Sequence, residues 1–231
     1  VDLADGRELA LKRTRAAASV RSLELFKREF HTLRGLRHPN IIEVYEYGID
    51  GDALYYTMER LRGSDLGKST PLPWPTVCRY LRQLAAALGL LHARRLLHRD
   101  ISPRNVWIFP DGRLKLIDFG ALGSFGVPTE VVGTLPLMAP EWLHARPLGR
   151  VVDQRADLYS LGALGYWLLT TRHAYRVSEH HVPHCWAETP PAPSFVAALL
   201  LDHTLPKIPA DLDALILALL RTDPAARPES T

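Results

Sequence analysis

Two acidic residues and one amide stand at the ends of a predicted β-hairpin in the middle of the chain. Two short apolar runs flank residues 110–113, whose sequence Pro-Asp-Gly-Arg has the composition of a tight turn. Asp100 and Asn105 precede this hairpin, and Asp118 follows it directly. Because hard cations prefer oxygen ligands, Asn105 and Asp118 are candidate ligands of Mg²⁺ or Mn²⁺. Asp100 is then left free to accept a proton.

Three short motifs, in a fixed order, resemble those of a known family. They are His98-Arg99-Asp100 with Asn105 five residues after the aspartate, then Asp118-Phe119-Gly120, then Ala139-Pro140-Glu141. Each triplet is weak alone, but together they resemble the protein kinases, and most closely the bacterial serine/threonine kinases of the eukaryotic type. The resemblance implies an α+β fold of two lobes, with a small, mainly antiparallel β lobe that carries one helix and a larger, mainly helical lobe.

The resemblance also implies a phosphate-positioning pair near the start of the chain. The strand Leu9-Ala10-Leu11-Lys12 is similar to the kinase strand whose lysine reaches the α- and β-phosphates of ATP. Apolar residues at helical spacing predict a helix over residues 20–34, on which Glu29 would pair with Lys12. Taken alone, Lys12 would be a solvated edge charge and Glu29 part of a local surface network. The family context favours the pair.

Further positions are implied to bind the nucleotide. Met58 stands at the family's gatekeeper position, and Glu59–Leu61 forms the hinge whose backbone binds adenine. Ala10 belongs to the same set through its strand motif. Trp107 lies where the family places a smaller aliphatic residue beneath adenine, so its ring either reshapes the pocket or stacks on the base. Asp65 resembles the acid near the ribose, although short acids in turns are also common for local reasons.

The implied reaction is transfer of the γ-phosphoryl group of ATP to serine or threonine hydroxyls of protein substrates. Asp100 would orient the hydroxyl and accept its proton, while Asn105 and Asp118 hold the metal ion. One departure is Ser102, which stands where serine/threonine kinases carry a lysine. Our hypothesis is that Arg104 supplies the missing charge. An arginine there is typical of tyrosine kinases, but the proline at position 103 and Gly133-Thr134 keep the serine/threonine pattern.

Other residues are implied to support this loop. Thr134 would support Asp100, Asp157 would anchor the backbone of the catalytic loop, and Arg227 would pair with Glu141. In the segment from 121 to 141, Thr129 or Ser124 would be the phosphorylation site, with Arg99 as the group that receives the phosphate. The alternative is an ordered segment that is never phosphorylated.

Composition restricts the other classes of function. The chain has 231 residues, of which 47% are hydrophobic, and a net charge of +3. Its basic residues are scattered, so no nucleic-acid partner is expected. Two cysteines, Cys78 and Cys185, imply no disulfide framework, and the chain has neither a signal peptide nor an apolar run of ~18 residues. We therefore expect a cytoplasmic protein without a membrane segment. The cluster His180, His181, His184 and Cys185 matches no zinc template well.

We expect one protein kinase domain, with residues 1–61 as a partial small lobe and hinge and residues 62–231 as the larger lobe. The glycine-rich loop that covers the phosphates is not found in the chain, which predicts a catalytic domain truncated at its N-terminus and leaves room for further domains outside it. The alternative is a domain that lacks the loop and would bind ATP weakly. Protein substrates and ATP are the expected partners. Two alternatives stay open: a scaffolding pseudokinase, which would be signalled by loss of Lys12, Asp100 or Asp118, and a small-molecule phosphotransferase, which would not show Ala139-Pro140-Glu141 with a partner Arg227.

Overall fold

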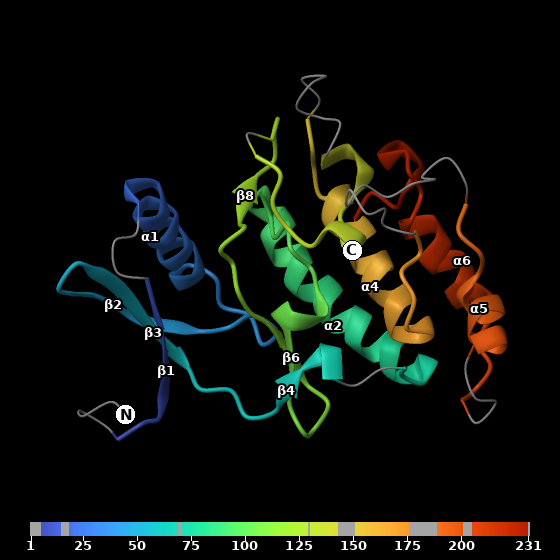
Figure 1. Ribbon diagram of the computed structural model, residues 1–231, viewed down its shortest axis with the longest axis horizontal. Coiled ribbons are helices and arrows are strands. Elements are labelled where there is room, and N and C mark those ends of the chain that lie inside the picture. The colour runs from blue at the N-terminus through green and yellow to red at the C-terminus, as the bar shows by residue number, and fades with distance from the viewer. Residues whose placement is uncertain are drawn as a thin grey trace.

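The computed structural model shows two lobes, a small one that holds β1 to β3 and α1 and a larger one that holds the other helices (Figure 1). It describes residues 6–14, 19–68, 71–128, 130–142, 151–175, 189–200 and 205–230. Thr129 and the cluster of His180, His181, His184 and Cys185 lie outside these ranges. Within them, no helix is both long and apolar enough to span a membrane.

The small lobe is a three-stranded antiparallel sheet of order β1-β3-β2 with one helix packed on it. Its strands are β1 (Leu9–Arg13), β2 (Val44–Asp50) and β3 (Ala53–Glu59), and its helix is α1 (Val20–Arg34). The predicted helix has the bounds that its periodicity indicated. It begins after Ser19, whose hydroxyl accepts a hydrogen bond from the Ser22 amide at 3.2 Å and so satisfies one of the unpaired amides of the first turn. Phe26, Phe30 and Leu33 lie buried on its inner face.

The two lobes are joined by backbone hydrogen bonds as well as by the chain. Ile42 donates to the Leu116 carbonyl at 3.0 Å, and the Leu116 amide donates to the Asn40 carbonyl at 2.8 Å. The backbone just before β2 thus pairs with the larger lobe, and β2 begins only at Val44. Leu116 belongs to β7 (Leu114–Leu116), which forms a small sheet with β6 (Val106–Ile108) and β4 (Ser64–Asp65). The predicted hairpin is therefore present.

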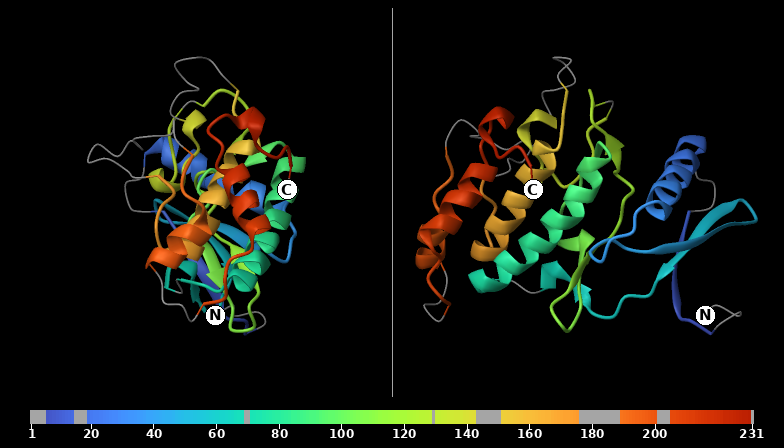
Figure 2. Two further views of the ribbon diagram at one scale, coloured as in Figure 1. Left: turned by 90° about the vertical axis from the view of Figure 1, so that its right-hand side faces the viewer. Right: turned by 180° about the vertical axis from the view of Figure 1, so that it is seen from behind.

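The larger lobe is built around α4 (Arg155–Thr170), a helix that is apolar around its circumference and buried on nearly all sides. It packs against α2 (Trp74–Ala93) and α6 (Ala210–Leu219), and α5 (Pro193–Leu200) lies at the end remote from the small lobe (Figure 2). Shorter elements complete the lobe: β5 (Leu96–Leu97) paired with β8 (Gly123–Ser124), and the 3₁₀ turns η1 (Leu66–Lys68), η2 (Pro103–Asn105), η3 (Leu135–Leu137) and η4 (Pro224–Ala226).

Candidate active site

Glu29 is the centre of a network that joins α1 to the sheet and to the larger lobe. It is only 4% exposed, and its Oε1 accepts from Lys12 Nζ at 2.7 Å, from the Tyr56 hydroxyl at 3.0 Å and from the Phe119 amide at 3.2 Å. Lys12 Nζ also donates to Asp118 Oδ1 at 2.9 Å. The predicted Lys12–Glu29 pair is thus present, and the alternative of a surface glutamate is wrong.

These contacts shift the acid–base equilibria of the ionised groups. Burial by itself would lower the pKa of Lys12, but the carboxylates of Glu29 and Asp118 outweigh it and raise that pKa above its usual 10.5. Burial by itself would raise the pKa of Asp118, but Lys12, the Gly120 amide and His98 bring that pKa below its usual 3.8. Lys12 and Asp118 therefore stay charged across the physiological range.

Two non-glycine residues of the site have strained, left-handed backbones, and buried carboxylates stabilise both. Arg99 has φ of 70° and Asp118 has φ of 59°. The Arg99 amide donates to Asp157 Oδ1 at 3.0 Å, and the amide of Phe119, just after Asp118, donates to Glu29. A strained backbone of this kind persists only where surrounding contacts stabilise it. The hydrogen bonds from these amides to Asp157 and Glu29 provide that stabilisation.

Asp157, at the start of α4, holds the catalytic loop as predicted. Its Oδ2 accepts from the His98 amide at 2.9 Å and bonds to His92 Nε2 at 3.0 Å. Burial alone would raise the pKa of Asp157, but the contact with His92, the Arg99 amide and the field of His98 together lower it. His98 itself is fully buried, and that burial outweighs the nearby carboxylates and lowers its pKa.

Asp100 is held by two side chains from different segments. Its Oδ1 accepts from the Thr134 hydroxyl at 2.6 Å, and its Oδ2 accepts from Asn105 Nδ2 at 2.8 Å. Thr134 can approach because Gly133, with φ of 117°, has no side chain: a Cβ there would lie 2.4 Å from the Arg99 carbonyl oxygen. The predicted contact of Thr134 with Asp100 is therefore present.

A cavity of about 340 Å³ lies between the sheet of the small lobe and β6 of the larger lobe. Seven of the residues predicted to bind nucleotide or phosphate line it: Ala10, Lys12, Met58, Glu59, Leu61, Trp107 and Asp118. Arg60 of the predicted hinge also lines it, and Ile42, Tyr56 and Ile117, which complete the lining, were missed. Tyr56 carried a signal, because residues two apart on a strand share a face and Tyr56 is two before Met58. The strand register pairs Ala10 with Met58 and Lys12 with Tyr56, which places all four on that face.

Side-chain contacts of Glu59 fix the hinge to both lobes. The Glu59 carboxylate forms a short ion pair with Lys115 of β7 and accepts from the Glu43 amide at 2.8 Å. Lys115 Nζ also donates to the Ile41 carbonyl at 3.3 Å. The first hinge residue is thereby tied to both lobes, a link between distant segments that sequence reasoning did not find.

Two predicted site residues, Asp65 and Arg104, lie outside both the cavity lining and the hydrogen-bond networks of Glu29 and Asp100. Asp65 pairs with Trp107 in the β4–β6 ladder, and its Oδ1 accepts from the Gly67 amide at 3.1 Å. That contact is the local role that was weighed against a ribose contact. Arg104 lies exposed in η2 and makes no side-chain hydrogen bond or ion pair to any other residue that the structure describes.

Basic residues gather where α1 faces the segment after Asp118. Arg28 Nη2 donates to Ser124 Oγ at 3.4 Å, and Arg21 forms an ion pair with Glu130 at 2.6 Å. The Arg99 guanidinium lies 5.1 Å from the Trp142 ring centroid, in space that is open because residue 123 is glycine: a Cβ there would overlap it. Burial and the nearby Arg28 lower the pKa of Arg99.

An ion pair between residues far apart in the sequence links two segments of the larger lobe. Arg227 is 4% exposed and its Nη1 and Nη2 donate to the two oxygens of Glu141 at 2.6 and 2.8 Å. It also donates to the carbonyls of Arg221, Arg155 and Thr222. This is the bridge predicted from the resemblance.

The donor set near Asp100 and Asp118 is compatible with a divalent cation that is shared with phosphate oxygens. Asn105 uses its Nδ2 toward Asp100, and Asp118 accepts through Oδ1 from Lys12 and from the Gly120 amide at 3.3 Å. One further oxygen on each of Asn105 and Asp118 remains without a hydrogen bond from the described residues. No cluster of three or more His, Cys, Asp or Glu side chains suited to a metal occurs among those residues. Mg²⁺ is commonly held by one or two protein oxygens together with substrate phosphates, so this sparse set fits.

The fold and the site together are those of a two-lobed kinase domain. The chain belongs to the protein kinase domain family, whose match extends over residues 1–231. This family uses ATP and a divalent metal ion and acts on protein substrates. The predicted resemblance and the predicted two-lobed fold are confirmed.

Relatives and a solved structure agree with this membership. The chain is 29% identical to the serine/threonine-protein kinase PrkC of Bacillus subtilis, over 99% of this chain and 36% of PrkC. It is 32% identical to the serine/threonine-protein kinase pkn2 of Myxococcus xanthus, over 90% of this chain and 26% of pkn2. Matches such as these span only about a quarter to two fifths of the relatives' lengths. The kinase PK-1 of Cydia pomonella granulovirus has the same fold, with a TM-score of 0.75 and 16% identity over 98% of this chain and 83% of that chain.

Proposed function

We propose that the protein to which this chain belongs transfers the γ-phosphoryl group of ATP to serine or threonine hydroxyls of other proteins. One observation carries the proposal: Lys12 contacts both Glu29 and Asp118, while Asp100 contacts both Asn105 and Thr134. A phosphate-positioning cation and a candidate base are thus oriented at the same time, as phosphoryl transfer requires. The serine/threonine-protein kinases among the relatives support the choice of substrate hydroxyl.

In this proposal, Asp100 orients the attacking hydroxyl and accepts its proton. Its two oxygens are held by Thr134 and Asn105, so the carboxylate cannot rotate freely and its remaining lone pairs have a defined direction. Lys12, held by Glu29, positions the phosphates and offers positive charge where negative charge develops.

We propose Mg²⁺ or Mn²⁺ as the metal ion, with Asn105 and Asp118 as its protein ligands. When bound, the ion neutralises charge on the transferring phosphoryl group. Asp118 suits this role because its depressed pKa keeps the carboxylate ionised.

We assign adenine to the cavity lined by Ala10, Met58, Leu61 and Trp107, with hydrogen bonds to the backbone of the hinge, Glu59–Leu61. The indole of Trp107 then stacks on the base. Asp65 is assigned to the ribose side through its place opposite Trp107 in the ladder. Residues 1–61 and 62–231 act as the two lobes of one kinase domain, in a cytoplasmic protein that carries further domains and has no nucleic-acid partner.

Arg104 is proposed to supply the charge that a lysine at position 102 would give. Arg104→Ala should lower kcat far more than it raises the KM for ATP, whereas Arg104→Lys, which keeps the charge, should retain most of the activity. An unchanged kcat in Arg104→Ala contradicts this assignment without touching the rest of the proposal.

The decisive experiment uses the full-length protein and ATP labelled at the γ-phosphate, with and without Asp118→Ala, followed by phosphoamino-acid analysis of a protein substrate. Label on serine or threonine that disappears in Asp118→Ala is the expected result. No transfer by the wild-type protein would favour a pseudokinase, label on tyrosine would change the substrate class, and transfer only to small molecules would favour the third alternative.

A further inference from the structure

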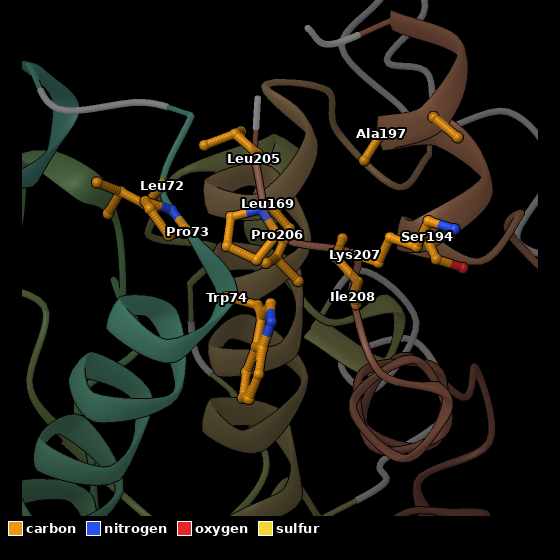
Figure 3. Close-up of a pocket in the computed structure, with 11 residues that line it drawn as sticks. Leu72, Pro73, Trp74, Leu169, Ser194, Ala197, Leu205, Pro206, Lys207 and Ile208 are labelled. Carbon is orange, nitrogen blue, oxygen red and sulfur yellow. The ribbon is translucent and has the colours of Figure 1, made fainter. Parts of the chain in front are cut away.

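A second cavity, of about 310 Å³, lies in the larger lobe at the end of α2 that is remote from the catalytic loop (Figure 3). Because α2 has 20 residues, this end is roughly 30 Å from the end that leads into the loop. Its lining comprises Leu72, Pro73, Trp74, Leu169, Ser194, Ala197, Ala198, Leu205, Pro206, Lys207 and Ile208. None of these residues belongs to the site described above.

The walls of this cavity come from separate elements that are fixed against one another. The Leu72 amide donates to the Leu168 carbonyl at 3.0 Å, which pins the start of α2 to the end of α4. Figure 3 shows Trp74 from α2, Leu169 from α4 and Ile208 from the segment before α6 around the same space. Nine of the eleven lining residues have apolar side chains, so the cavity suits an apolar body.

Of the polar groups in the lining, Ser194 is already satisfied. Its amide donates to Asp213 Oδ1 at 3.0 Å, and its hydroxyl donates to Asp213 Oδ2 in a short hydrogen bond. The carboxylate of Asp213 is engaged by the same contacts. Lys207, by contrast, is exposed and makes no side-chain hydrogen bond or ion pair to another described residue. The described lining therefore offers one unpaired charge, and it is positive.

We propose that this cavity binds a small amphipathic carboxylate, that is, an aliphatic chain or aromatic ring with a single acidic group. The apolar body would lie between Trp74, Leu169 and Ala197, and the carboxylate would pair with the Lys207 ammonium. A nucleotide does not fit this chemistry, because several phosphate charges would face one cation and no cluster of backbone donors. A volume of about 310 Å³ is at the small end of the range for ligand pockets, which selects a compact ligand.

Trp74 provides a direct readout that does not depend on catalysis. Decanoic acid with bromine on its chain should quench Trp74 fluorescence in the wild-type protein, and Trp74→Phe should lose that part of the quenching. Saturating ATP should leave it unchanged, because the adenine cavity is a separate site. The probe is used below its micelle-forming concentration, with circular dichroism to check that each variant is folded.

Two substitutions test the ion pair between Lys207 and the ligand carboxylate and the position of the apolar body beside Ala197. Lys207→Gln should weaken decanoate binding about two- to fivefold, as expected for loss of one exposed ion pair, while Lys27→Gln on the exposed face of α1 should leave it unchanged. Ala197→Phe should block binding by filling the cavity, and the milder Ala197→Leu serves if the larger change unfolds the protein.

The neutral analogue decanol distinguishes recognition of the carboxylate charge from nonspecific hydrophobic binding. It should bind the wild-type protein about as weakly as decanoate binds Lys207→Gln. Equal affinity of the wild-type protein for decanol and decanoate, quenching that ATP displaces, or quenching that survives in Ala197→Phe would each overturn the proposal. So would the absence of any quenching.

Discussion

Replacing Glu29 is the sharpest test of how the small lobe and the larger lobe are coupled at the site. Three donors, Lys12, Tyr56 and the Phe119 amide, converge on the same oxygen, Glu29 Oε1. In Glu29→Gln the corresponding amide oxygen can still accept hydrogen bonds, but it no longer carries a charge. Lys12 then keeps a charged partner only in Asp118, whose side chain is 53% exposed.

The size of the effect follows from the kind of bond that is lost. Hydrogen bonds to charged groups are worth about 1.5–3 kcal/mol and neutral ones about 0.5–1.5 kcal/mol, so Glu29→Gln should cost about 1–1.5 kcal/mol of transition-state stabilisation. This corresponds to a fall in kcat/KM of about 5- to 13-fold. Glu29→Ala removes the contact altogether and should lower kcat/KM by about 10- to 150-fold.

The assay is steady-state phosphorylation of a protein substrate at varied ATP concentration, with thermal denaturation of each variant to show that it is folded. Glu24→Gln is the matched control, since Glu24 lies exposed on the same helix and its side chain makes no hydrogen bond or ion pair to another described residue. If both Glu29 variants stay within twofold of the wild-type kcat/KM, the network does not position Lys12 and this reasoning is wrong.

Three further perturbations test the supports of the larger lobe. Thr134→Val removes the 2.6 Å hydrogen bond to the Asp100 carboxylate and should lower kcat by about 10- to 150-fold at nearly constant KM for ATP; an unchanged kcat would contradict the role of this contact. Arg227→Ala leaves the Glu141 carboxylate unpaired and should destabilise the fold by about 3–5 kcal/mol, seen as a fall in Tm of about 6–20 °C, and a fall below 2 °C would refute it. Asp157 has a depressed pKa, so its contribution to stability is present above the usual carboxyl pKa of 3.8 and is lost as the pH falls through the lower folded value. Asp157→Asn should therefore be less stable than wild type in urea at pH 7, with a smaller further loss between pH 5 and pH 2; parallel curves for the two proteins would contradict this.

Sequence alone was sufficient for the elements whose pattern is local. The helix over residues 20–34 was predicted with its observed bounds because its apolar positions recur at helical spacing. The hairpin after Asn105 was predicted because a turn of suitable composition separates two apolar runs. The pairs Lys12–Glu29 and Arg227–Glu141 were reached only through the family resemblance, since nothing local relates residues 17 or 86 positions apart.

Element ends were less well predicted where tertiary pairing decides them. Ile42 is an apolar residue of good strand propensity, which by itself favours a strand that includes it. The backbone there pairs instead with Leu116 of the larger lobe, so the strand begins at Val44. No periodicity in the small lobe carries that information.

Within the site, the sequence by itself determined which chemical groups are available: the acids Asp100 and Asp118, the amide of Asn105 and the cation of Lys12. Tertiary structure alone decided how they are held. The hydroxyl of Tyr56 reaches Glu29 only because α1 packs on β3, and Lys115 reaches Glu59 only because β7 lies behind the hinge. The physical reason is that spacing along a chain fixes the faces of single helices and strands, whereas contacts between elements depend on how those faces pack.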